Sequence, residues 1–433
     1  MTMLHDNLSV NEEGHLTLGG VDTVTMAEKY GTPLYLLDED RVRKNCRTYL
    51  SAMQEHFGGT SGPLLASKAL SFKGIYRIAK EEGMRTDLVS LGEMFTAHAA
   101  GFPLSRAYFH GNNKTDYDIE TAMAFGVGTF VVDNREELLA IERIAGEKDK
   151  TQDILLRLTP GIDPHTQEKI STGKVDSKFG SAIETGQAEE ITREALSLPH
   201  VRLLGFHCHV GSQIFEQTPF TDAADIMLAF MACMRDRYGF TATVLNLGGG
   251  FGVRYTEEDP IFDYAEGIRL VAKHVKARCA EYAFPMPEIL MEPGRSIVAD
   301  AGLTLYTVGG VKTITGYKSY VSVDGGMPDN PRYALYASRY TAVLASNMRA
   351  ERDFVATLAG RCCESGDLIG EDMLMARPTR GDILAVLVTG AYNFSMASNY
   401  NRIPRPPLVL ISEGKDTLGV RRESYEDLYR LDV

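Results

Sequence analysis

Several side chains that can do chemistry stand at one kind of position in this chain, the end of a short apolar run. Lys68, His209 and Glu292 each occupy such an end, and the glycines Gly248–Gly250 occupy another. A lysine amine forms Schiff bases with carbonyl compounds, and a carboxylate can hold a protonated ring nitrogen. Adjacent glycines let backbone N–H groups approach an anion closely. These residues are candidates for a reaction centre if the elements before them bring them together.

Eight such runs occur, and a helical pattern follows each of them. The runs are Pro63–Lys68, Arg85–Leu91, Ala107–Gly111, Thr129–Asn134, Ile154–Pro160, Leu203–Gly211, Val244–Gly250 and Glu288–Gly294. Eight strand–helix units predict an α/β fold, a (β/α)8 TIM-like barrel whose active site lies at the carboxyl ends of the strands. We therefore expect Lys68, Arg157, His209, the triple glycine and Glu292–Arg295 at the mouth of one barrel.

The pattern changes after Arg295, which divides the chain into a barrel and a second domain. We assign residues 36–295 to the barrel. Residues 296–433 are assigned to a mostly β domain, because they are rich in Val, Thr, Leu and Tyr and lack helical periodicity. The strands of residues 1–35 are expected to join that second domain. Within the barrel, the polar and glycine-rich stretch Gly161–Gly180 is expected to form a loop over the mouth.

The composition is that of an ordinary globular protein with an acidic balance. The chain has 433 residues, of which 44% are hydrophobic, and a net charge of −13. That charge disfavours binding to nucleic acid or to anionic membranes. We find no run of membrane-spanning length and no signal peptide. Six cysteines without a CxxC motif indicate reduced thiols, and we expect a cytoplasmic protein.

The chemistry of Lys68 depends on its burial. A lysine at the buried mouth of a barrel favours the neutral amine, because burial penalises the ammonium form. A neutral amine is the nucleophile that attacks a carbonyl carbon. Alternatively, the side chain reaches solvent or pairs with a carboxylate such as Asp87, and then it has no chemical role.

The last two barrel runs end in a possible anion site. Gly248–Gly250 follows the seventh run, where barrels commonly bind phosphate, although tight turns use glycines too. Glu292 and Arg295 either form an ion pair with each other or serve different partners. In the second case Glu292 holds a ring nitrogen, and Arg295 holds a phosphate or carboxylate. Both interpretations stay open.

His207 and His209 lie on one face of the sixth run. Such a pair can bind zinc, but no third ligand is evident in the sequence, and we expect no metal. Otherwise an imidazole stacks on a planar cofactor or is hydrogen-bonded in the core. Ser212, which follows closely, is a candidate for a hydrogen bond to phosphate.

Two stretches of the second domain add further candidates. Cys363 is a thiol beside carboxylates on a polar turn, and a candidate proton donor, because vicinal cysteines are poorly placed for a disulfide. Tyr392 ends a strong apolar run and can present a hydroxyl. Arg332 and Tyr336 add a guanidinium and another phenol.

Together these motifs resemble the fold type III, alanine-racemase-like enzymes that use pyridoxal 5′-phosphate (PLP), and among them the diaminopimelate decarboxylases. The resemblance runs from about Gly31 to about Ile411. It rests on Ala66-Ser-Lys68, His207-Cys-His-Val-Gly-Ser-Gln213, Gly248-Gly-Gly250, Glu292-Pro-Gly-Arg295, Asp324-Gly-Gly-Met327 with Arg332, Cys363-Glu-Ser-Gly-Asp367 and Gly390-Ala-Tyr-Asn393. Their joint occurrence in this order is highly specific.

The resemblance implies a role for each motif. Lys68 forms the Schiff base with PLP, His209 stacks on its ring, and Glu292 pairs with the ring nitrogen. The phosphate is held by Ser212, Gly249, Gly250, Gly294, Arg295 and Tyr392. The substrate is contacted by Arg295, Arg332, Tyr336 and Tyr392. Glu364 binds the distal ammonium of the substrate, and Cys363 donates the proton. In this family Cys363 and Glu364 reach the active site of the partner subunit, which implies a homodimer with shared sites.

Glu292 bears on the type of reaction. Decarboxylation leaves two electrons on Cα, and PLP accepts them only while its ring nitrogen is protonated, which a carboxylate favours. Racemases of this fold place an arginine there, so Glu292 indicates a decarboxylase. Arg295, Arg332 and Glu364 together suit a distal group with both charges. That implies meso-2,6-diaminopimelate as the substrate and L-lysine and CO₂ as products, the last step of lysine biosynthesis.

Three alternatives remain. A decarboxylase of the same fold would act on ornithine, lysine, arginine or carboxynorspermidine. A non-catalytic homologue would bind PLP or a partner protein without turnover. A zinc hydrolase would use His207 and His209. In addition, Tyr333 stands where a proline is expected in some relatives, which weakens the comparison around Arg332.

Overall fold

The computed structural model of the chain describes residues 3–162 and 178–433. The chain forms two compact units. The barrel unit contains Cys46–Gly252 and Phe262–Gly294, and the second unit contains Met1–Asn45, Val253–Ile261 and Arg295–Val433. Residues 36–45, 253–261 and 295, which the sequence pattern assigns to the barrel, thus group with the second unit. Most of the loop expected over the mouth, residues 163–177 of 161–180, lies outside the described residues.

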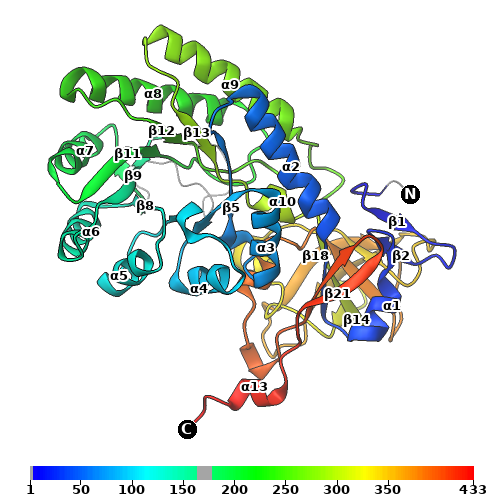
Figure 1. Cartoon of the computed structure of the whole chain (residues 1–433). Coiled ribbons are helices and arrows are strands. Elements are labelled where there is room, and N and C mark those ends of the chain that lie inside the picture. The colour runs from blue at the N-terminus through cyan, green and yellow to red at the C-terminus, as the bar shows by residue number, and fades with distance from the viewer. Residues whose placement is uncertain (1–2, 163–177) are drawn as a thin grey trace. The chain divides into compact units, whose positions relative to one another are not determined.

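Eight parallel strands close into a ring in the barrel unit, which confirms the predicted (β/α)8 barrel (Figure 1). In ring order they are β5 (Gly62–Ala66), β6 (Arg85–Leu88), β7 (Ala107–Phe109), β8 (Thr129–Val132), β9 (Gln152–Thr159), β11 (Val201–His207), β12 (Val244–Asn246) and β13 (Glu288–Met291). The ring closes where Leu290 of β13 pairs with Gly62 of β5. The short β10 (Ser181–Ala182) adds to β9.

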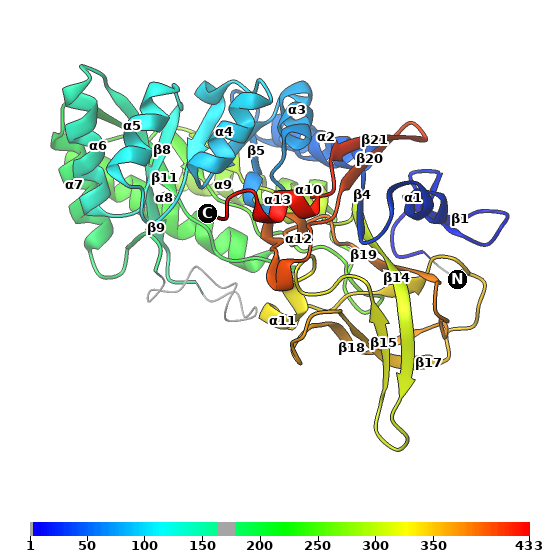
Figure 2. The same cartoon turned by 90° about the horizontal axis from the view of Figure 1, so that it is seen from below.

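Helices surround this ring of strands in both views of the molecule (Figures 1 and 2). Those of the barrel unit are α3 (Lys73–Glu82), α4 (Leu91–Ala99), α5 (Asp116–Ala124), α6 (Arg135–Glu147), α7 (Gln187–Ser197), α8 (Thr218–Tyr238) and α9 (Tyr264–Glu281). Polar side chains fix their starts, because the first N–H groups of a helix lack partners. Thr115 and Asp118 form a capping box on α5, and Asn134 caps α6.

A cluster of buried side chains from six of the barrel strands supports the strand ends. Its members are Leu64, Tyr108, Val131, Leu155, Val244 and Leu290. Burying one large apolar side chain stabilises a fold by roughly 1.5–3 kcal/mol. Because alternate residues of a strand point to opposite sides, this packing also fixes which side chains reach the mouth.

The second unit is mostly β, as predicted. Its main sheet has the order β18-β17-β15-β14-β4-β20-β21, and β19 joins it beside β14. The strands are β4 (Leu34–Asp38), β14 (Gly302–Thr313), β15 (Ser319–Val323), β16 (Ala342–Leu344), β17 (Phe354–Ala359), β18 (Leu368–Met375), β19 (Ile383–Leu387), β20 (Leu408–Ser412) and β21 (Lys415–Val420). The long antiparallel pair β14–β15 is plain in Figure 2.

The N-terminal segment contributes to this second unit. β4 pairs antiparallel with β14 and parallel with β20, so it lies inside the main sheet. A small sheet precedes it, formed by β1 (Leu8–Val10), β2 (Leu16–Leu18) and β3 (Val21–Asp22). The helices that lie wholly or partly in the second unit are α1 (Thr23–Tyr30), α2 (Glu39–His56), α10 (Arg295–Val298), α11 (Arg332–Tyr336), α12 (Asn393–Met396) and α13 (Tyr425–Tyr429).

None of the helices in the described parts of the chain combines the length and the apolar character that crossing a membrane requires.

Candidate active site

Every strand of the barrel carries a residue able to do chemistry at or near its carboxyl end. In ring order these residues are Lys68, Asp87, His110, Asp133, Arg157, His207, Asn246 and Glu292. Parallel strands of a barrel end at the same rim, so the eight side chains surround one mouth. Asp133 and Asn246 escaped the sequence analysis.

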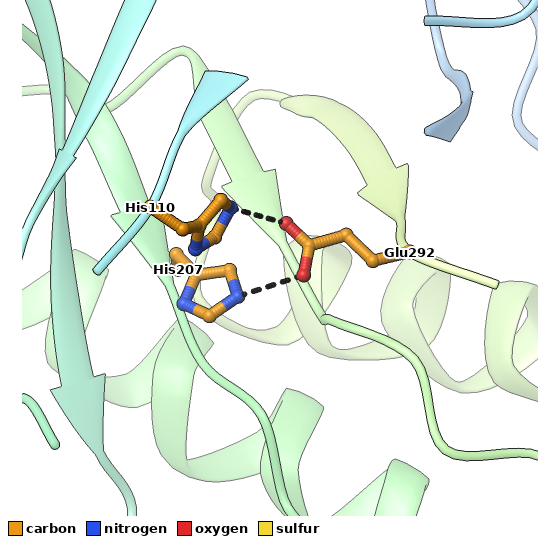
Figure 3. Close-up of side chains that lie close together, drawn as sticks. All are labelled: His110, His207 and Glu292. Carbon is orange, nitrogen blue, oxygen red and sulfur yellow. Dashed lines mark hydrogen bonds and ion pairs between the residues drawn. The ribbon is translucent and has the colours of Figure 1, made fainter. Parts of the chain in front are cut away.

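Glu292 lies buried beside His110 and His207 (Figure 3), and Asn246 is its third polar neighbour. Its Oε1 accepts a hydrogen bond from Asn246 Nδ2 at 2.7 Å, and its Oε2 accepts one from His207 Nε2 at 3.2 Å. His110 Nε2 lies 2.8 Å from Oε1, but off the direction of a hydrogen bond. The carboxylate therefore has two aligned donors and one close contact.

Burial decides the charge of this cluster. It lowers the pKa of His207 to about 4 although Glu292 attracts a proton to the ring, and it lowers the pKa of His110 in the same way. Burial alone would raise the pKa of Glu292, but the two imidazoles hold it well below its usual range. At neutral pH the cluster thus carries one negative charge, on Glu292.

Asn246 links this carboxylate to the glycine turn. Its Oδ1 accepts the Gly248 N–H at 2.9 Å, which orients the amide so that Nδ2 faces Glu292. The carbonyl oxygen of Gly248 in turn accepts the Glu292 N–H at 2.8 Å. A Cβ on Gly249 would stand 2.1 Å from the carbonyl oxygen of Glu292, so only glycine permits this approach. The glycine turn and Glu292 therefore form one bonded group.

His209 is oriented by the same turn. Its Nδ1 accepts the Gly249 N–H at 3.2 Å, which leaves the ring proton on Nε2. Burial lowers the pKa of His209 well below its usual range, and the charges of Lys68 and Arg157 lower it further. A neutral, fixed imidazole suits stacking on a planar ring. Ser212, three residues on, lies half-buried in the loop after β11.

Lys68 lies in a tight turn after β5, and hydrogen bonds to two carboxylates hold this turn in place. Asp87 Oδ1 accepts the Ser67 N–H at 2.8 Å. Glu93 Oε2 accepts the Ser67 hydroxyl at 2.9 Å and the Val89 N–H at 2.6 Å. Both carboxylates lie on the next strand–helix unit, so they tie the Lys68 turn to its neighbour in the ring.

The side chain of Lys68 is exposed, and the burial expected from the sequence is wrong. The turn lifts it out of the apolar run, while its neighbours Ser67 and Ala69 are buried. Within the described part of the chain, the amine makes no hydrogen bond or ion pair, although its charge favours the ionised form of Asp87. The amine is thus accessible for reaction.

The end of β13 presses closely on this turn. Pro293 O accepts the Ala66 N–H at 3.1 Å, and a Cβ on Gly294 would lie 2.8 Å from the Cβ of Ala66. Glycine at 294 thus lets the strand that carries Glu292 approach the turn that carries Lys68.

A buried ion pair anchors the loop that follows His110. Lys114 Nζ donates to Glu137 at 2.7 Å and to the carbonyl oxygens of Gly111 at 2.9 Å and Val131 at 2.8 Å. The side-chain carboxylate of Glu137 therefore bonds Lys114, whereas the backbone N–H of Glu137 donates to the capping side chain of Asn134. The cap of this helix and the ion pair therefore use different groups of Glu137.

The second unit contains two buried arginines that share a set of tyrosines. The guanidinium of Arg295 lies 4.9 Å from the ring centre of Tyr392 and 5.7 Å from that of Tyr255, whose hydroxyl accepts its Nη1–H at 2.8 Å. The guanidinium of Arg332 lies 4.9 Å from the ring of Tyr392 and 5.1 Å from that of Tyr336. Tyr392 thus lies near both cations.

Arg332 still has unused donors. Its Nε is buried without a hydrogen-bond partner among the described residues, and its Nη2 reaches Ser338 Oγ only at 3.5 Å. Leaving a buried charged donor unpaired costs about 1–3 kcal/mol or more. An anionic ligand would remove that cost, and a carboxylate matches the fork of a guanidinium.

The turn between β17 and β18 presents Cys363 and Glu364 at the surface. Both side chains are exposed, and the Cys363 N–H donates to Asn401 Oδ1 at 2.9 Å. Cys362 is half-buried, and burial together with Asp367 raises the pKa of its thiol to about 12. Cys363 is therefore the accessible thiol of the pair, and neither forms a disulfide.

The barrel groups fit PLP by their donor chemistry. A carboxylate offers about four lone-pair positions, and the contacts of Glu292 leave room for one further donor, such as a ring N–H. His207 and His209 have different partners, because His209 bonds Gly249 while His207 meets His110 and Glu292. The ligand atoms of these last three residues lie within 4.8 Å of one another, close enough to hold a metal ion.

Residues 39–299 match the family model described as pyridoxal-dependent decarboxylase, pyridoxal binding domain. The chain belongs to this family. PLP is therefore the cofactor of this chain.

Individual relatives cover almost the whole chain. The diaminopimelate decarboxylase of Bacillus subtilis is 46% identical over 99% of this chain and 98% of its own length. A crystal structure of diaminopimelate decarboxylase from M. jannaschii in complex with L-lysine has a TM-score of 0.91 at 32% identity, covering 100% of this chain and 99% of that one. The lysine/ornithine decarboxylase of Vibrio vulnificus with putrescine has a TM-score of 0.75 at 26% identity, covering 90% and 97%.

The expected site residues fall into two groups in the structure. Lys68, His209, Ser212, Gly249, Gly250, Glu292 and Gly294 belong to the barrel unit, and Arg295, Arg332, Tyr336, Cys363, Glu364 and Tyr392 to the second unit. Asn246 and Tyr255 were missed. An asparagine inside the apolar run Val244–Leu247 was the available signal for the first, whereas nothing marked Tyr255.

Proposed function

We propose that this decarboxylase removes one carboxylate of meso-2,6-diaminopimelate and releases L-lysine and CO₂, the last step of lysine biosynthesis. The observation that carries the reaction type is the ionised Glu292 among uncharged donors. The full-length relatives named diaminopimelate decarboxylase support the substrate.

Bound PLP supplies an electron sink for the electron pair that departing CO₂ leaves on Cα. Glu292 would hold a proton on the ring nitrogen and so keep that sink effective, because a negative neighbour stabilises the protonated ring. Lys68 would hold the cofactor covalently through its amine. His209, fixed by Gly249, would cover one face of the ring.

The phosphate of the cofactor needs N–H and hydroxyl donors. We assign it to Ser212, Gly249, Gly250, Gly294, Arg295 and Tyr392. The Gly248 and Gly249 N–H groups already donate to Asn246 and His209. The amide of Gly250 is thus the best candidate of the turn for the anion.

Substrate recognition rests on the second unit. Arg295, Arg332, Tyr336 and Tyr392 would bind the distal carboxylate, and the unpartnered Nε of Arg332 supports this assignment. Glu364 would take the distal ammonium. Cys363 would return a proton to Cα, since its thiol is the accessible one.

Cys363 and Glu364 are exposed in the single chain, which is why we assign them to the active site of a second copy. The protein would then be a homodimer with two shared sites. Equal mixing of Lys68→Ala and Cys363→Ala chains should restore about a quarter of the wild-type activity, because half of the dimers are mixed and each keeps one intact site. Mixtures that stay inactive would contradict sharing. The free thiols also support a reducing, cytoplasmic location.

The deciding experiment measures CO₂ release and L-lysine formation from meso-2,6-diaminopimelate with added PLP, beside ornithine, L-lysine and arginine. Turnover of meso-2,6-diaminopimelate alone is the expected result. Turnover of a simple diamine precursor would overturn the roles of Arg332 and Glu364. Lys68→Ala should lose both turnover and the visible absorbance of the bound cofactor, and a retained band would contradict the role of Lys68.

A decarboxylase for ornithine or lysine is the second candidate, because the Vibrio vulnificus lysine/ornithine enzyme shares the fold. Its lower identity and coverage make it the weaker one. The same substrate panel separates the two.

A further inference from the structure

His207 and Asn246 are as deeply buried as any polar groups in the barrel, and the proposed reaction assigns neither of them a task. Their exposed fractions are 1% and 0%. Both side chains donate a hydrogen bond to Glu292. The other polar atom of Asn246, Oδ1, accepts the N–H of Gly248. A buried amide with both ends bonded cannot flip without losing two hydrogen bonds.

The proton of His207 is fixed as well. Its Nε2 donates to Glu292, so Nδ1 carries the lone pair, and this Nδ1 is buried without a partner in the described chain. An unsatisfied buried acceptor is a cost that packing alone does not explain. The orientation of the ring thus gives Nε2 its hydrogen bond to Glu292 and leaves Nδ1 without one.

The partners of Glu292 are unusual because they are uncharged. A buried carboxylate is ordinarily paired with a lysine or arginine, which cancels its charge. The cationic groups near this cluster, Lys68, Lys114 and Arg157, form no hydrogen bond or ion pair with Glu292 in the described part of the chain. Uncharged donors hold the carboxylate in place and leave its negative charge for a ligand.

We propose that His207 and Asn246 are positioning residues that hold the Glu292 carboxylate, uncancelled, for the ring nitrogen of the cofactor, with His110 as a third and weaker support. Neither residue touches the reacting atoms. The inference rests on the proposed function, since it takes the cofactor nitrogen as the ligand of Glu292.

The test compares His207→Leu with His207→Gln. Leucine fills the space without a donor, whereas the amide nitrogen of glutamine can occupy the position of Nε2. Affinity of the apoprotein for PLP is measured by titration, and the protonation of the ring nitrogen is read from the ¹⁵N chemical shift of labelled PLP. His98→Leu, on the exposed part of α4, is the matched control.

Removing a group that orients a ligand-binding side chain commonly costs 10–100-fold in affinity. We expect His207→Leu to weaken PLP binding by roughly that factor and to move the ¹⁵N shift towards the unprotonated value. His207→Gln should stay within about threefold of the wild type, as should His98→Leu. Wild-type affinity and shift in a folded His207→Leu protein would overturn the proposal, and so would equal losses in the leucine and glutamine variants.

Asn246→Asp is the second variant, in case the leucine protein does not fold. Aspartate keeps the acceptor for Gly248 but replaces the donor to Glu292 with another acceptor. PLP binding should weaken at neutral pH, and unchanged affinity would contradict the role of Asn246. Wild-type protein that does not bind PLP at all would instead refute the proposed function, so the two failures are distinguishable.

Discussion

The barrel and the second unit each contain a buried charge that the chain leaves open, and they do so by opposite means. In the barrel, N–H donors of His207 and Asn246 surround the anion Glu292. In the second unit, aromatic faces of tyrosines lie against the cations Arg295 and Arg332. Within the described part of the chain, no lysine or arginine pairs with Glu292 and no carboxylate pairs with Arg332, although a counter-ion is the commonest solution.

The difference indicates which ligand group each region selects. Hydrogen bonds from uncharged donors stabilise an anion without neutralising it, so Glu292 remains attractive to a cationic ring nitrogen. Ring faces stabilise a guanidinium from above and below, so its N–H edge remains available to a carboxylate. The proposed cofactor, with its protonated ring, would suit the first region, and the proposed substrate, with its distal carboxylate, would suit the second.

Glu292→Gln should have the largest effect, because it removes the charge of the barrel cluster while leaving the second unit unchanged. His207 can switch its ring proton to Nδ1 and accept from the new amide, so we expect a folded protein. Losing one preorganised electrostatic group typically costs about 10²–10³-fold in kcat. Steady-state kinetics should show this loss with KM nearly unchanged.

Glu258→Gln, an exposed carboxylate, is the control for that variant. A large rise in KM with kcat preserved would mean that Glu292 serves substrate binding, and the distinction between the two regions would fail.

Acid should destabilise the barrel through His207. Its pKa is about 4 in the folded protein, against about 6.5 when unfolded, so only the unfolded state takes up this proton between these values. Stability is therefore lost as the pH falls through that window, by roughly 2–3 kcal/mol between pH 7 and pH 4.5. The depressed pKa of Glu292 adds a loss of the same sign, chiefly below the usual range of a glutamate.

Urea unfolding at both pH values, on the wild type and His207→Gln, isolates this contribution. The glutamine variant should lose less stability on acidification. Equal losses in the two proteins would mean that His207 is protonated in the folded state.

Arg332→Met should impair substrate binding alone, whereas Glu292→Gln should impair the chemical step. Methionine keeps apolar contact with the tyrosines but removes every N–H. Hydrogen bonds to a charged group contribute about 1.5–3 kcal/mol, so kcat/KM for meso-2,6-diaminopimelate should fall by about 10–100-fold, mainly through KM. Arg339→Met, a surface arginine paired with Glu258, is the control. A fall in kcat alone would contradict the assignment.

Tyr255→Phe should have the smallest effect. The ring stays against Arg295, and only the hydrogen bond to Nη1 is lost. We expect a decrease of up to about tenfold in kcat/KM. Tyr317→Phe, whose ring is 88% exposed, should match the wild type. If Tyr255→Phe also matches it, stacking rather than the hydroxyl holds Arg295.

The sequence predicts the fold because its signals are local. Apolar runs of strand length and the change of pattern after Arg295 each lie within a few residues. The site motifs were also found, since Lys68 and Glu292 stand at the ends of such runs.

What could not be read from the sequence is which distant residues meet. The donors to Glu292 come from other strands, and Asn246 and His207 lie 46 and 85 residues away. The exposure of Lys68 follows from a turn that Asp87 and Glu93 fasten from the neighbouring unit, whereas an apolar run before a lysine suggested burial. Such contacts depend on ring closure and register, which local patterns do not contain.

The closure of the ring between β13 and β5 has a consequence for how the protein is made. The two strands that meet there are the last and the first of the barrel to leave the ribosome, so the ring stays open for most of synthesis. Glu292 emerges just behind the last of these strands. Until then the chain lacks the carboxylate that we assign to the ring nitrogen of the cofactor. We therefore expect the newly synthesised chain to bind PLP only after the barrel is complete.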